Sequence, residues 1–235
     1  FCYGTAPPRS HPPVPPGPPV VRQGSGLRPR QISRLATEVS ALVHAGHECV
    51  IVSSGAVAAG LATLGLTARP KELAAKQACA AVGQSQLMHA YASAFGRQKI
   101  GVAQLLLTHS DLDSRTRHRN ARSTLAHLLA RHNVVPIINE NDSVAVEELN
   151  FGDNDRLSAE VAILVEADRL IILTSVDGLQ DSSGKIVPLV RDVSAVASFV
   201  RSDKGHVSTG GMVTKRQAVQ LDVNAGIQVN IASGR

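Results

Sequence analysis

The sequence predicts an α/β fold, a three-layer sandwich in which helices cover both faces of a mainly parallel, open sheet. Helical patterns alternate with apolar strands from residue 29 onward. The strands are continuous apolar runs, which is typical of strands buried on both faces. Each strand also ends in small polar residues, and ligands bind beyond the carboxyl ends of the strands in such sheets. These three observations predict the fold class and the edge at which a site lies.

Each element follows from its own pattern. Ile32, Leu35, Val39 and Leu42 recur at helical spacing, and Gly46 stops that helix. Further helices are predicted over 70–95, 114–132, 155–166 and 211–225, and strands over 49–54, 100–108, 134–139, 169–174 and 227–233. Residues 175–208 are mixed, with a turn at 181–185.

The first residues have a different composition. Residues 1–30 hold nine of the twelve prolines, which cannot pack a core. We expect residues 1–26 to be an extended or disordered, non-native arm, and residues 27–235 to form one domain. A proline-rich docking ligand is the alternative for the arm.

Charge and cysteine content restrict the class of protein. Residues 1–37 hold five arginines and no acid, which leaves 24 − 5 = 19 basic against 19 acidic residues in the rest. A neutral body argues against a nucleic-acid surface. Three cysteines without a CxxC pair favour a reducing, cytoplasmic setting. No apolar run reaches the roughly 18 residues that span a membrane.

Two polar segments follow predicted strands. SSGAVAAG (53–60) is a strand-turn-helix junction in which Ser54 presents a hydroxyl and Gly55 lets backbone N–H groups approach an anion. An ordinary capped helix start is the alternative. INENDSVAVEELNFGDNDRLSA (138–159) gathers amides and carboxylates, among them Asp142, Asn154 and Asp155. Asn154 can bind a carboxylate, an aspartate can orient a lysine or a metal, and a simple N-cap is the alternative.

STGGMVTK (208–215) predicts a phosphate site. Thr209, Gly210 and Gly211 open a helix, and Lys215 lies on its first turn. Free N–H groups, the helix dipole and an ammonium would face one spot. A glycine-rich turn with a solvated lysine is the alternative.

Other catalytic patterns are missing. The sequence has no GxSxG elbow, no GxGxxG after the first strand, and no histidine at metal-ligand spacing with cysteine. The histidines at 109, 118, 127 and 132 lie on or near a polar helix, and we expect them at the surface.

Together these segments resemble the glutamate 5-kinases of the amino acid kinase family. The resemblance rests on VSSGAVAAG, KQACAAVGQSQL, INENDSVAVEEL, FGDNDRLSA, LTSVDGL and STGGMVTK, which occur in the family's order between residues 52 and 215. It implies phosphorylation of the side-chain carboxylate of L-glutamate by ATP with Mg²⁺, the first step of proline biosynthesis.

The resemblance also assigns residues. Ser54, Asp142 and Asn154 match the glutamate-binding positions, Lys215 matches a catalytic lysine, and Asp155 matches the aspartate that organises the lysines. The ATP-binding positions are Thr174, Ser175, Thr209, Gly210, Gly211, Met212, Val213, Thr214 and Lys215.

The chain departs from the family's pattern at three places. The first strand, which carries a lysine in the family, is missing or degenerate, because the first lysine is Lys71 and VVRQGSG (20–26) offers only Arg22. Ser175 stands where the family usually has aspartate. The kinase domain is expected to be truncated at its C-terminus, without the RNA-modification-type domain of many bacterial members. We therefore expect poor stability and impaired activity.

Three alternatives remain. An acetylglutamate kinase takes a substrate without a free ammonium, which Asp142 disfavours. A non-catalytic remnant would bind glutamate or proline only. An interaction module would use the proline-rich arm. The resemblance also implies a homo-oligomer, feedback by proline, and glutamate-5-semialdehyde dehydrogenase as a partner.

Overall fold

We analysed a computed structural model, which describes residues 4–5, 29–145, 153–174, 178–181, 183–190, 193 and 209–233. The helices are α1 (Pro29–His44), α2 (Ala56–Leu61), α3 (Leu73–Gly96), α4 (His109–Asp113), α5 (Arg115–Leu129), α6 (Asp153–Leu164) and α7 (Thr209–Asn224). The strands are β1 (Gly4–Thr5), β2 (Ile51–Val52), β3 (Gly101–Leu107), β4 (Val134–Glu140), β5 (Arg169–Thr174) and β6 (Gln228–Ser233).

The strands form two three-stranded sheets. In the first, the order is β2-β4-β3 and both pairings are parallel. In the second, the order is β1-β5-β6; β5 and β6 are parallel, and β1 is antiparallel to the start of β5. The parallel character predicted from the apolar runs is therefore confirmed.

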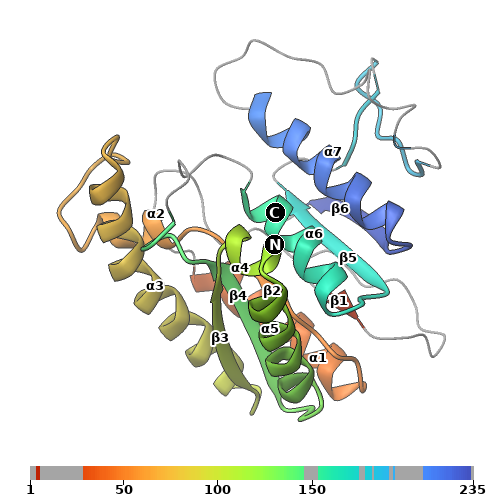
Figure 1. The fold of residues 1–235 in the computed structure, drawn as a ribbon, viewed down its shortest axis with the longest axis horizontal. Helices are drawn as coiled ribbons and strands as arrows, with labels where there is room; N and C mark the ends of the chain where they lie inside the picture. The colour runs from red at the N-terminus through yellow and green to blue at the C-terminus, as the bar shows by residue number, and fades with distance from the viewer. Residues whose placement is uncertain are drawn as a thin grey trace.

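The two sheets form the middle layer of a single sandwich (Figure 1). One core cluster joins α1 and α3 to Ile51 of β2 and to Ile171 and Leu173 of β5. The opposite cluster joins α5 and α6 to Val52 of β2 and to Ile172 of β5. Because both sheets contribute to both cores, helices cover each face of the layer, as the three-layer prediction requires.

The apolar periodicity of α1 explains how it packs. Its buried side chains are spaced three or four residues apart, so they lie on one face: Ile32, Leu35, Ala36, Val39 and Val43. Gly46, with φ of +90°, ends the segment, and its N–H donates to Val43 O at 3.0 Å. The predicted helix and its stop are both confirmed.

The structure differs from the predicted elements in three respects. β2 pairs over two residues only, Ile51–Val52, although the apolar run is longer. The five-residue helix α4 was not predicted. β1 was not predicted either; it pairs with β5 only at Arg169 and Leu170. The rest of the arm lies outside the described residues, so its disorder and the boundary at residue 27 stay predictions.

Candidate functional site

The carboxyl ends of β2, β3 and β4 meet at one edge of the first sheet, as the sequence predicts. The Ser53 N–H, just after β2, donates to Ile138 O at 2.7 Å. The Asn141 N–H, just after β4, donates to the carbonyl that ends β3 at 3.0 Å. Ser54 and Asp142, each the next residue after one of these hydrogen-bonded positions, are both half-buried. The edge thus collects two of the three predicted glutamate-binding residues.

Gly55 makes the turn between β2 and α2 possible. Its φ is +97°, a left-handed conformation that glycine adopts without steric cost. Beneath the turn, Ser53 is fully buried and its Oγ lies 3.2 Å from Tyr91 Oη. Burial raises the pKa of Tyr91, so this pair is a neutral hydrogen bond at physiological pH. This hydrogen bond therefore fixes Ser53, the residue just before the Ser54 turn, against α3.

Helices α2 and α3 are in direct backbone contact. A Cβ on Gly60 would lie 2.0 Å from Cys79 O, and one on Gly83 would lie 1.8 Å from Ala56 O. Real Cβ atoms do not approach an oxygen so closely, so only glycine fits at either position. This contact explains Gly60 and Gly83, and it ties the helix that follows the Ser54 turn to α3.

Helix α3 also contacts the loop after β4. Asn139 Nδ2 donates to Gln84 Oε1 at 2.8 Å, and Gln77 Nε2 donates to Ala145 O at 3.1 Å. The loop residues between them form a single turn, in which Val144 N–H donates to Asn141 O at 3.1 Å. Neither glutamine was predicted as a site residue. Their signal in the sequence is two polar residues seven apart on an otherwise apolar helix face.

Asn154 and Asp155 lie in the first turn of α6, as predicted, and both are half-buried. Asn154 Oδ1 is buried and has no hydrogen-bond partner among the residues that the structure describes. A buried unpaired oxygen is unfavourable, so this acceptor fits a site that is completed by a donor on a ligand. The side chain of Asp153 lies outside the described residues.

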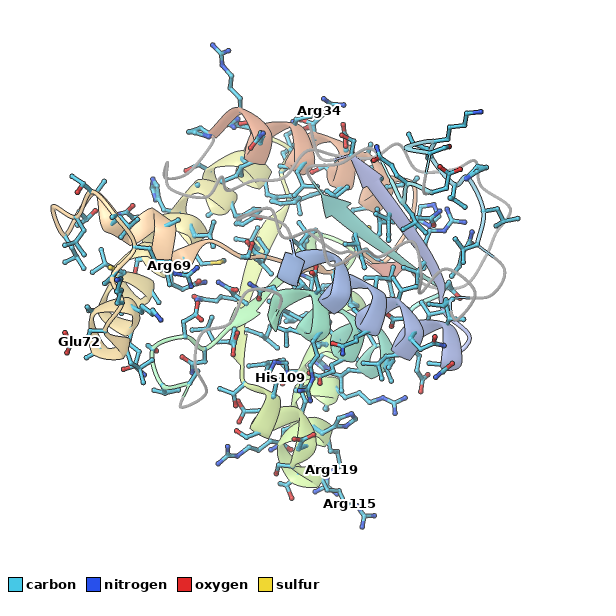
Figure 2. All side chains as sticks on the ribbon, turned by 90° about the horizontal axis from the view of Figure 1, so that it is seen from above. Arg34, Arg69, Glu72, His109, Arg115 and Arg119 are labelled. Carbon is cyan, nitrogen blue, oxygen red and sulfur yellow. The ribbon has the colours of Figure 1, made fainter. Side chains whose placement is uncertain are left out.

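His109 corrects a prediction. It was expected at the surface, but it is only 8% exposed, and its Nδ1 lies 2.7 Å from Glu160 Oε2 of α6. Figure 2 shows His109 within the body of the molecule, whereas Arg115 and Arg119 project outward. Thr108 and Asp111 form a capping box that starts α4, and this pattern in the sequence could have placed His109 at a helix N-terminus.

The contact between His109 and Glu160 is an ion pair when His109 is protonated. The hydrogen bond to Glu160 raises the pKa of His109 and outweighs the opposing effect of burial, with a further contribution from the charge of Glu140. Burial alone would raise the pKa of Glu160, but hydrogen bonds from His109 and Arg156 lower it below its usual value. The pair links α4, at the end of β3, to α6 at a position six residues, or nearly two turns, beyond Asn154.

The predicted nucleotide-binding positions are described in part. Thr174 ends β5 in register with Ser233, at the end of β6. The backbone of Thr209 to Lys215 is helical at the start of α7, which confirms the predicted helix opening. Ser175, and the side chains of Thr174 and of residues 209–215, lie outside the described residues. Their role in binding ATP stays a prediction.

Two further features concern the described residues alone. No cluster of three or more histidine, cysteine, aspartate or glutamate side chains within them could hold a metal ion. In the same part of the chain, every helix is too short or too polar to cross a membrane.

Comparison with known proteins places the chain in a family. A model of the amino acid kinase family matches residues 20–233. This chain belongs to the amino acid kinase family. Two solved structures of similar fold are a carbamate kinase from Giardia lamblia bound to citric acid, with a TM-score of 0.60 and 14% identity, and an aspartate kinase from Synechocystis, with a TM-score of 0.58 and 14% identity. The chain aligns over 91% of its length with the former, covering 89% of it, and over 88% with the latter, covering 36%. At these identities they support the fold alone.

Curated relatives are more similar. The chain is 47% identical over 212 residues to the glutamate 5-kinase of Corynebacterium diphtheriae, a match that covers 88% of this chain and 56% of that protein. It is 49% identical over 220 residues to the glutamate 5-kinase of Citrifermentans bemidjiense, covering 91% and 59% respectively. The chain therefore spans a little over half the length of these two relatives. The resemblance read from the motifs is confirmed.

Proposed function

We propose that the chain binds L-glutamate and MgATP and transfers the γ-phosphoryl group to the glutamate side-chain carboxylate, giving glutamyl 5-phosphate. The observation that carries this proposal is the 47–49% identity to proteins named glutamate 5-kinase across about nine-tenths of the chain. The geometry of the described edge supports it, because Ser54 and Asp142 follow paired parallel strands there.

The proposed roles follow from charge. Asp142 holds the α-ammonium of glutamate, because a carboxylate is the natural partner of that cation. The Ser54 hydroxyl and the Asn154 amide nitrogen donate hydrogen bonds to the carboxylate groups, and the α-ammonium is the donor that glutamate offers to Asn154 Oδ1, which is unpaired among the described residues. Both substrates are anions, so catalysis requires alignment and offset of charge rather than a covalent intermediate. Lys215 supplies positive charge at the transferring phosphoryl group, and Asp155 orients the side chain of Lys215.

In this proposal the nucleotide binds at the carboxyl edge of the second sheet. Thr174 and Ser175 follow β5, and residues 209–215 form the first two turns of α7. Backbone N–H groups at a helix N-terminus favour phosphate. Mg²⁺ enters with ATP as part of the substrate.

The test is glutamate-dependent ADP release with MgATP from the full chain and from Lys215→Ala. We expect glutamate-dependent ADP release from the full chain and a loss of at least about tenfold in the variant. Equal rates in both proteins would contradict the role of Lys215. N-acetylglutamate, assayed in parallel, is expected to be inactive; activity with it alone would establish the acetylglutamate kinase alternative.

A non-catalytic glutamate-binding protein is the alternative that the missing lysine favours. Glutamate binding without ADP release would establish it. Feedback by proline, a homo-oligomer and a dehydrogenase partner stay predictions, which proline titration, light scattering and pull-down can each test.

A further inference from the structure

Two glutamines on one face of α3 hold both ends of the loop that contains Asp142. Gln77 and Gln84 are seven residues apart, two helical turns, so their side chains lie above one another. Gln84 contacts Asn139 at the end of β4, just before the loop, and Gln77 contacts Ala145 at the end of the loop. Asp142 therefore lies between two residues, Asn139 and Ala145, that are both hydrogen-bonded to the same helix.

The contact at Gln84 has a defined polarity. The Glu140 N–H donates to Asn139 Oδ1 at 2.9 Å, so the amide nitrogen of Asn139 must point toward Gln84. That nitrogen donates to Gln84 Oε1 at 2.8 Å. Asn139 is 1% exposed and Gln84 is 9% exposed. Buried hydrogen bonds of this kind fix a unique geometry, because neither amide can turn to water.

Gln84 is not explained by packing alone. Its Nε2 is buried and has no hydrogen-bond partner among the described residues. A buried unpaired N–H is unfavourable, and a leucine of similar volume would avoid it. A residue that breaks a local rule in this way is expected where function requires it. What Gln84 provides is the acceptor for Asn139.

The same helix also holds the Ser54 turn. Gly83, the neighbour of Gln84, lies in backbone contact with Ala56, two residues after Ser54. The turn after β2 and the loop after β4 are thus attached to adjacent residues of α3, through a close backbone contact on one side and a hydrogen-bonded amide on the other.

We infer that α3 sets the distance between Ser54 and Asp142, and that Gln84 and Gln77 are positioning residues for the amino-acid substrate. This inference rests on the proposed function for the assignment of the substrate, but the clamp itself is a property of the protein without ligand. Neither glutamine touches the reacting atoms in this scheme; both act through the loop at 139–145.

The first test needs no substrate. Backbone hydrogen exchange of residues 139–145 is measured by mass spectrometry on the full chain and on Gln84→Leu. We expect exchange about tenfold faster or more in the variant, with α6 unchanged, because one of the two anchors is lost. Gln84→Glu keeps an acceptor oxygen for Asn139 and is expected to retain slow exchange. Gln86→Leu, on the same helix but bonded to Thr63, is the matched control.

The second test uses calorimetry with glutamate and MgATP. Gln84→Leu is expected to raise the Kd for glutamate by about tenfold or more and to leave that for MgATP within about twofold. If Gln84→Leu does not fold, Gln77→Leu tests the other end of the loop by the same measurements.

The outcomes separate the two proposals. Unchanged exchange at 139–145 in folded variants would overturn the clamp. Faster exchange, combined with no glutamate binding even by the parent chain, would keep the clamp and contradict the proposed function. Faster exchange with unaltered glutamate affinity would overturn the positioning role.

Discussion

Gly83 of α3 lies directly against the carbonyl group of Ala56 in α2, so closely that a Cβ at Gly83 would be 1.8 Å from that oxygen. The contact is reciprocal, since a Cβ at Gly60 of α2 would be 2.0 Å from Cys79 O of α3. Two helices this close can only shift together. Helix α2 begins right after the Ser54 turn. The contact between α2 and α3 therefore contributes both to the stability of the fold and to the position of Ser54.

Gly83→Ala is expected to lower the free energy of unfolding by about 3 kcal/mol, because the added methyl group meets backbone rather than a side chain that can turn aside. Denaturant unfolding measures this change. Gly96→Ala is the control, since it lies in the same helix with nothing within 4 Å of an added Cβ. It should be neutral or stabilising by up to about 1 kcal/mol. Equal effects of the two substitutions would contradict the close contact.

His109→Gln is expected to lower stability by about 1 kcal/mol near pH 6 and by less at high pH. The raised pKa of His109 means that its contribution is complete below about 6.5 and is lost as pH rises through its folded value. The lowered pKa of Glu160 means that its contribution is complete above about 4.5 and is lost as pH falls through its folded value. The pair is therefore strongest between these limits.

Thermal unfolding across pH 4 to 9 measures the His109 effect. The groups that act on the ring are Glu160, Glu140 and Arg156. His89→Gln, an exposed histidine of α3, is the control and should follow the parent curve. A constant difference between His109→Gln and the parent at every pH would show that the ion pair does not contribute.

Asp222→Asn is expected to stabilise the protein at pH 8 by about 2 kcal/mol. Asp222 is fully buried near the end of α7, and neither carboxylate oxygen has a hydrogen-bond partner among the described residues. Burial raises its pKa to about 7. The folded state therefore binds a proton that the unfolded state has released, and the parent loses stability as pH rises from about 4 to 7 and then levels off.

Unfolding by urea at several pH values tests this expectation. Asp222→Asn should flatten that part of the stability curve, whereas Asp113→Asn, at an exposed position in α4, should not. A parent protein whose stability increases steadily from pH 4 to 7, with no difference in Asp222→Asn, would contradict it.

Cys49 is expected to resist alkylation in the native state. It is 2% exposed, and burial, aided by the charge of Glu48, raises the pKa of its thiol to about 12. The reactive thiolate is then nearly absent at pH 8. Mass spectrometry after iodoacetamide treatment should find Cys49 modified only when denaturant is added; rapid native labelling would show that the segment before β2 opens.

Much of the fold was predictable because the longer helices have an apolar periodicity and the longer strands are continuous apolar runs. Helix α1 follows from the spacing of Ile32, Leu35 and Val39, and the sheet edge follows from the polar residues that end each strand. The limits have physical causes. The pairing of β2 over only Ile51–Val52 depends on neighbouring strands, which the local pattern does not contain.

The site was predictable only where its residues lie in strand ends and helix starts. Ser54, Asp142 and Asn154 lie at such positions, and the family resemblance assigns them to glutamate, a role that stays a prediction; the residues that support them were not predicted. His109 was assigned to the surface because its partner Glu160 is 51 positions away. Gln84 and Asn139 are 55 apart, and contacts of this range follow from packing rather than from local sequence.

Calorimetric titration of L-glutamate into the folded chain and into Asp142→Asn tests the central claim most directly, since it does not depend on turnover. We predict that glutamate binds the parent, that N-acetylglutamate does not, and that Asp142→Asn weakens glutamate binding by about tenfold to a hundredfold through loss of the ammonium contact. No glutamate binding by a folded parent chain, or equal binding by the parent and Asp142→Asn, would contradict the account.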